Sequence, residues 1–90
     1  MPKVYVPSRL REHTSNLSEV DAAAGRVRSV LDELARRFPG LGAAVRDEAG
    51  EIHAFVNIFV NGKDLRSLDG QDTVVDQDDE VFIIPAMAGG

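Results

Sequence analysis

The chain has 90 residues, of which 43% are hydrophobic and 28% charged, a composition typical of one soluble globular domain and too short for two. It contains no cysteine, which excludes disulfides, thiolate metal sites and a cysteine nucleophile. The formal net charge of −5 argues against a nucleic-acid partner, because binding to a phosphate backbone usually needs an excess of basic side chains.

The first predicted element is a short strand. Residues 3–6 alternate a charged or aromatic side chain with valine, the period of a half-buried strand, which Pro7 ends. A polar stretch, 8–16, follows, and residues 17–21 are a candidate for a second short strand.

The hydrophobic period changes to that of an α-helix after Gly25. The apolar positions stand at i, i+3, i+4, i+7 and i+11, and they are Val27, Val30, Leu31, Leu34 and Phe38. On the opposite face, the spacing predicts i,i+4 ion pairs of Asp32 with Arg36 and of Glu33 with Arg37. The Pro-Gly pair at 39–40 is expected to end the helix, with a short helical turn over 41–48.

Two further strands are predicted in the second half. Residues 53–60 alternate and are followed by an Asn-Gly turn at 61–62. The two faces of this strand are expected to be Val56, Ile58 and Val60 on one side and Phe55, Asn57 and Phe59 on the other. Residues 63–79 form a polar connection. Individual side chains of Leu65, Leu68 and the Val74-Val75 pair are expected to lie under the sheet. Residues 81–84 are apolar on both faces, as in an interior strand with a covered side.

This order of elements predicts an α+β fold, a mixed β-sheet with one main helix packed on one face. The helix can serve as a crossover that sets the last strand beside the first in parallel. Residues 1–85 are expected to form the domain, followed by a flexible C-terminal tail, residues 86–90.

The charge is divided unevenly between the two halves. Residues 1–46 hold eight basic and five acidic side chains, whereas residues 47–90 hold two basic and ten acidic ones. Half of those ten acids lie between positions 72 and 80. A solvated turn that prevents edge-to-edge pairing of strands explains this cluster, and so does an acidic shoulder that steers a basic partner; both readings stay open.

No motif for catalysis or cofactor binding is recognisable. His13 and His53 lie 40 residues apart with no cysteine, so no metal site is expected. No serine lies in a Gly-x-Ser-x-Gly context, and no phosphate-binding loop or dinucleotide fingerprint is present. No stretch approaches the roughly 20 apolar residues of a membrane span. We therefore expect a cytoplasmic protein that is not itself an enzyme, binds no cofactor and has no membrane partner.

The chain ends in Ala86-Met87-Ala88-Gly89-Gly90, directly after the last predicted strand. Two glycines can pass through a narrow channel that any Cβ would block. Five extended residues reach roughly 17 Å, enough to deliver the terminal carboxylate into the active site of another protein. A frayed end is the alternative reading.

Together, the order of elements, the strand and turn at 55–62, the acidic turn at 76–80 and the ending at 81–90 resemble the MoaD/ThiS family of ubiquitin-like sulfur carriers. The resemblance covers essentially the whole chain, is strongest from residue 53 onward and is closest to the CysO-type carriers of actinobacteria. It implies the β-grasp fold.

The resemblance also implies a mechanism centred on Gly90. A ubiquitin-activating-type enzyme would adenylate the Gly90 carboxylate with ATP, and a sulfurtransferase or other sulfur donor would convert the adenylate to a thiocarboxylate. A sulfur-accepting synthase would then take the sulfur, in a cysteine, molybdopterin, thiamin or thiosugar pathway. Two alternatives stay open: a modifier conjugated to lysines through Gly90, and a plain β-grasp interaction domain.

Partner binding is expected on the sheet face away from the helix. Phe59 and Phe82 are the candidates there, although the pattern leaves open whether these rings belong to the core. The remaining candidates lie toward the chain end and are Pro85, Ala86, Met87, Ala88 and Gly89.

Overall fold

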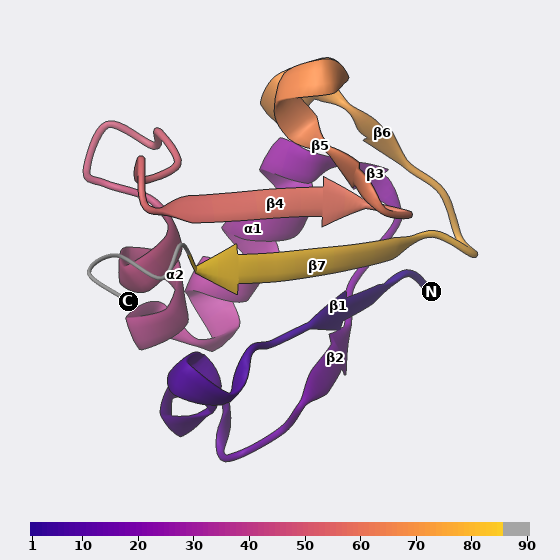
Figure 1. Cartoon of the computed structure of the whole chain (residues 1–90). Coiled ribbons are helices and arrows are strands. Elements are labelled where there is room, and N and C mark those ends of the chain that lie inside the picture. Colours follow the sequence, from indigo (N-terminus) through magenta and orange to yellow (C-terminus); the bar gives the residue numbers. More distant parts are fainter. Residues whose placement is uncertain (86–90) are drawn as a thin grey trace.

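A mixed five-stranded sheet with helices on one face forms the body of the molecule in the computed structural model, which describes residues 1–85 (Figure 1). In spatial order the strands are β2 (Glu19–Asp21), β1 (Lys3–Tyr5), β7 (Glu80–Pro85), β4 (Val56–Val60) and β5 (Lys63–Asp64). β1 and β7 run parallel, and the other neighbouring pairs are antiparallel. The predicted α+β, β-grasp arrangement is therefore confirmed, including the parallel pairing of the first and last strands.

Shorter elements fill the connections between these strands. They are a two-stranded ribbon of β3 (Gly25–Arg26) and β6 (Val74–Val75), and the 3₁₀ turns η1 (Ser8–Thr14), η2 (Leu65–Ser67) and η3 (Gly70–Asp72). Individual side chains of this connection are buried, as predicted, and they include Leu65 and Val75. Val75 is buried, whereas Val74 is exposed, because neighbouring side chains of a strand point to opposite faces.

The main helix, α1 (Val27–Arg37), carries the predicted apolar stripe. Val27, Val30, Leu31 and Leu34 are buried, and Phe38 packs half-buried against the same core. The predicted end of this helix is confirmed, because α1 stops at Arg37, and the helical turn predicted over 41–48 begins two residues earlier, as a second helix, α2 (Pro39–Val45). Proline is tolerated in the first helical turn because its missing N–H has no intrahelical partner there in any case.

The two helices approach closely at Gly42. A Cβ on Gly42 would lie 2.6 Å from the Cβ of Ala35, so α2 can rest against α1 only with glycine at this position. Of the two ion pairs predicted on α1, Glu33 with Arg37 forms, at 2.9 Å. Asp32 instead accepts from Arg46, at 2.7 Å, which ties α1 to the residue that follows α2.

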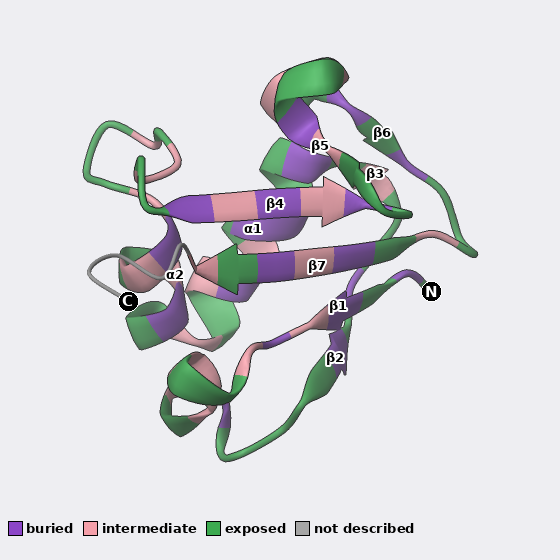
Figure 2. Cartoon of the chain, in the orientation of Figure 1, coloured by how far each residue is buried: buried purple, intermediate pink, exposed green. Residues whose placement is uncertain are grey.

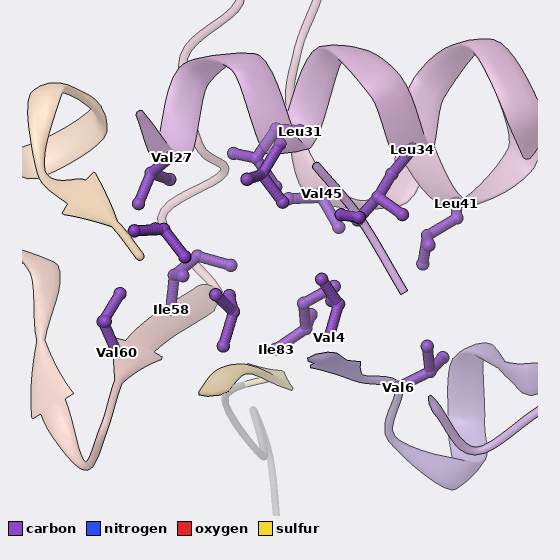
Figure 3. Close-up of a cluster of buried hydrophobic side chains, with 14 of the residues drawn as sticks. Val4, Val6, Val27, Leu31, Leu34, Leu41, Val45, Ile58, Val60 and Ile83 are labelled. Atoms are coloured by element: carbon purple, nitrogen blue, oxygen red, sulfur yellow. The ribbon is translucent and has the colours of Figure 1, made fainter. Parts of the chain in front are cut away.

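The core lies between the helices and one face of the sheet. Figure 3 shows Leu31, Leu34 and Leu41 pointing from the helices toward Val4 and Ile83 on the strands. Within residues 1–85, every buried side-chain nitrogen and oxygen has a hydrogen-bond partner.

The strand predicted from residue 53 begins three residues later, at Val56. The Val56 N–H donates to the His53 carbonyl at 3.0 Å, which closes a turn just before β4. Phe55 therefore does not share the outward face with Asn57 and Phe59. It is 53% exposed and stacks on His53, with 4.8 Å between the ring centroids.

Candidate functional site

The central strand β7 carries the chain end toward the tail, so its surroundings define the candidate site. Its side chains alternate between the two faces of the sheet: Val81 and Ile83 are buried against the helices, whereas Phe82 is half-buried and Ile84 is 44% exposed (Figure 2). β7 is an interior strand, as predicted. Its second face, however, is not covered by another layer of residues 1–85.

An aromatic row crosses this uncovered face. Tyr5 on β1 is the register partner of Phe82, and Phe82 is in turn the partner of Phe59 on β4. The rings of Tyr5 and Phe82 are stacked, with centroids 4.6 Å apart and planes 11° apart. We call Tyr5, Phe59, Phe82 and Ile84 the outer face. Phe59 and Phe82 therefore lie outside the core, on the side away from the helices.

A hydrogen bond fixes the Tyr5 end of the row. The phenolic O–H donates to Oε2 of Glu80 at 2.7 Å. This bond, together with desolvation and the negative charge of Glu80, raises the pKa of Tyr5 to about 12, because ionisation would break the bond and place two negative charges side by side. The ring is thus held neutral and in one orientation.

The acidic turn before β7 is organised by its own hydrogen bonds. Asp79 accepts from the backbone N–H of Asp76 and from the side chain of Asn61, and these bonds lower its pKa. Asn61 in turn accepts from the backbone N–H of Glu80, and it adopts the left-handed conformation, φ 51°, that a two-residue hairpin turn requires. The Asn-Gly turn and the acidic turn are therefore joined, whereas Asp78 lies exposed.

The predicted partner-binding residues fall into two groups. Phe59 and Phe82 come together in the aromatic row, and Pro85 ends β7, half-buried, as the register partner of Val56. The other predicted site residues are Ala86, Met87, Ala88, Gly89 and Gly90, and they lie outside the described residues.

Two residues of the outer face were not predicted from the sequence. Ile84 could have been found, because the period of two along β7 places it on the same face as Phe82. Tyr5 had no such signal, because its neighbourhood with Phe82 depends on the parallel register between the two ends of the chain.

The two histidines have different surroundings. His53 donates from Nε2 to the Ala43 carbonyl at 3.0 Å, and His13 packs on Gly40, near Glu12. Across residues 1–85, no three histidine, aspartate or glutamate side chains come together as a metal site would require. The same residues contain no helix with the length and apolar character needed to cross a membrane.

The chain matches the family model described as ThiS family over residues 4–90. It belongs to the ThiS family. This ThiS-family chain is 36% identical to the sulfur carrier protein CysO of Mycobacterium tuberculosis over 89 residues, which are 97% of this chain and 96% of the relative.

Solved structures resemble the ThiS-family chain over its whole length. A chain in the crystal structure of the Amycolatopsis orientalis BexX/CysO complex matches it with a TM-score of 0.91 at 33% identity. The match covers 100% of this chain and 100% of that one. The solution structure of the small archaeal modifier protein 1 from Methanosarcina acetivorans matches with a TM-score of 0.87 at 28% identity, covering 99% of this chain and 95% of that one. The resemblance to CysO-type carriers is confirmed, and the fold is the ubiquitin-like β-grasp.

Proposed function

We propose that this protein is a sulfur carrier whose C-terminal Gly90 transports sulfur as a thiocarboxylate. One observation carries the proposal: the ThiS-family match extends through residue 90, where the chain ends in Gly89-Gly90. The near full-length identity to a protein named sulfur carrier CysO supports it.

The chemistry needs a partner enzyme, because a carboxylate is a poor electrophile. The Gly90 carboxylate attacks the α-phosphorus of ATP on an adenylating enzyme, which releases pyrophosphate and leaves an acyl-adenylate. A sulfur donor then displaces AMP from the carbonyl carbon, which leaves the thiocarboxylate. On a sulfur-accepting enzyme the thiocarboxylate sulfur forms a bond to the acceptor. Water then attacks the carbonyl carbon, which breaks the carbon–sulfur bond, leaves the sulfur on the acceptor and regenerates the carboxylate. ATP is thus bound by the partner, and this chain is a co-substrate and not an enzyme.

The outer face is the proposed docking surface for the adenylating enzyme. Phe59, Phe82 and Ile84 offer apolar area beside the strand that leads into the tail, and they are not needed to fill the core. Aromatic side chains of this kind are enriched at the centres of protein interfaces. Proximity to the tail would let one partner hold the body of the carrier while it receives Gly90.

A second function, attachment to lysines, is favoured by the likeness to the archaeal modifier protein. Both fates begin with the same adenylate, and they differ only in whether a sulfur donor or an amine attacks it.

The intact mass of the protein isolated from its own cells decides between the two. Replacement of one oxygen by one sulfur supports the carrier, whereas a ladder of adducts with higher-mass proteins supports the modifier. A chain that lacks Gly90 is expected to keep its circular dichroism spectrum and melting temperature and to lose the sulfur-bearing mass. Full biological activity of that shortened chain would contradict both functions and support a plain interaction domain.

A further inference from the structure

A small apolar hollow opens beside β4. Its volume is about 190 Å³. Its lining includes the apolar residues Ile52, Val56, Ile58 and Leu65, and its polar residues include Asn57, Asp64 and Arg66. An engineered cavity of about 150 Å³ holds benzene, whereas small-molecule sites usually measure about 300–1,000 Å³. The hollow therefore suits one aromatic or branched aliphatic side chain rather than a metabolite.

The hollow lies where the sheet edge is uncovered. β4 pairs with β7 over five residues, but β5 pairs only with Phe59 and Val60. After Asp64 the chain turns into η2 (Figure 1), because the Asp64 carboxylate accepts from the backbone N–H of Arg66 at 2.8 Å. Among residues 1–85, residues 56–58 thus have a strand neighbour on the β7 side alone. An uncovered edge of this kind can accept an extended peptide through main-chain hydrogen bonds.

The guanidinium of Arg66 lies at the rim of the hollow, and hydrogen bonds fix its position. Arg66 donates to the two carboxylate oxygens of Asp64 at 3.0 and 2.6 Å, and to Oδ1 of Asn57 at 2.9 Å. These three bonds occupy Nε and Nη2, so the two N–H groups of Nη1 are not used by them. The bonds that Asp64 accepts from the side chain and from the backbone N–H of Arg66 lower the pKa of Asp64 to about 2, so this ion pair stays charged at neutral pH. The side chain is nevertheless 76% exposed.

We propose that the hollow and Arg66 together bind an extended segment of a partner protein, one that carries an apolar side chain next to a carboxylate. The apolar side chain fills the hollow, and the carboxylate accepts from Nη1 of Arg66. Because Asp64 and Asn57 fix the guanidinium beforehand, little side-chain entropy is lost on binding. This surface adjoins the outer face, because Asn57 is the register partner of Ile84. The proposal holds whether or not Gly90 carries sulfur.

Peptide titration of the ¹⁵N-labelled full chain by NMR tests the proposal. The probe is acetyl-Thr-Leu-Glu-Thr-amide, and the two matched peptides replace its glutamate by glutamine or its leucine by alanine. We expect saturable shifts of the Ile58, Leu65 and Arg66 amides with the first peptide. Each matched peptide should bind at least threefold more weakly, since one loses the carboxylate and the other the filling of the hollow.

Variants of the chain separate a specific site from general charge attraction. Residues 47–90 contain two basic side chains, Lys63 and Arg66, so Lys63→Gln is a control with the same charge change as Arg66→Gln. We expect Arg66→Gln to weaken binding at least threefold, Arg66→Lys to fall between, and Lys63→Gln to leave it unchanged.

Four results would overturn the proposal: equal weakening by Arg66→Gln and Lys63→Gln, shifts centred on Tyr5 and Phe82, no saturable shift, or a hollow already occupied by the chain's own end. The last would appear as the same Ile58 and Leu65 shifts when residues 86–90 are removed and no peptide is added.

Discussion

The two faces of the sheet differ although the same strands build both. Toward the helices, β1, β4 and β7 present valine and isoleucine side chains that are almost completely buried, such as Val4 and Ile83. Away from the helices, the neighbouring residues Tyr5 and Phe82 are half-buried and stacked, and Ile84 is largely open. The residues that fill the core and the residues proposed for docking thus alternate along one strand.

The difference has a simple energetic meaning. Complete burial of an aliphatic side chain contributes about 1.5–3 kcal/mol, so the helix-facing residues carry most of the stability. A stacked aromatic pair stabilises the fold by about 0.5–1.5 kcal/mol beyond the area that it buries. The rings of the outer face are therefore held in place while part of their surface stays accessible to partners. Substitutions on one face at a time test this division between the two faces.

The largest expected effect is the loss of folding stability when a helix-facing side chain is truncated. Ile83→Ala removes a buried side chain, 2% exposed, from the central strand and should lower the free energy of unfolding by about 2–5 kcal/mol. The adjacent Ile84→Ala removes the same atoms from the outer face and should cost less than about 1 kcal/mol. Urea denaturation measures both, and similar losses for the two variants would contradict the division between the faces.

The second expected effect is on docking. Phe82→Ala and Phe59→Ala should weaken binding to the adenylating enzyme about tenfold, as truncation of an interface aromatic commonly does. Phe55→Ala is the matched control, because Phe55 is exposed but lies in the turn before β4, off the outer face. Calorimetric titration gives the dissociation constants. Unchanged binding by both outer-face variants, with several kcal/mol of lost stability, would assign these rings to the fold alone.

The smallest effect concerns the hydrogen bond that fixes Tyr5. Tyr5 is the single tyrosine of a chain without tryptophan, so its ionisation can be followed by ultraviolet absorbance. The midpoint should lie near pH 12, and Glu80→Gln should move it toward the ordinary value of 10. Asp78→Asn changes a neighbouring exposed acid and should leave the midpoint in place. A wild-type midpoint near 10, with the native circular dichroism spectrum retained, would refute the bond.

The same pKa shift sets the direction of a stability change. The folded state keeps the Tyr5 proton more tightly than the unfolded chain does, so this contribution is complete below pH 10 and is lost as the pH rises toward 12.

Much of the fold was determined by local patterns in the sequence. Three predictions depend on residues that are close together in the chain: the 3.6-residue period of α1, the period of two in β4 and β7, and the Asn-Gly turn. In each case the structure contains the kind of element that the pattern predicted. Errors occurred at boundaries. The helical turn predicted from residue 41 begins at Pro39, and the strand predicted from residue 53 begins at Val56, whose N–H donates to the His53 carbonyl.

Tertiary structure decided which residues meet across the sheet and between the helices. Arg36 lies four residues after Asp32, the spacing of a helical ion pair. In the structure, however, Asp32 accepts a hydrogen bond from Arg46, the residue after α2. The sequence pattern left open whether the Phe82 ring lies in the core or outside it. In the structure the helices cover the opposite face of the sheet, and the ring lies on the outer face, stacked on Tyr5. The hollow beside β4 likewise exists because β5 ends after two residues. Periodicity is a property of neighbours along the chain, whereas these contacts depend on the register between segments that are far apart in it.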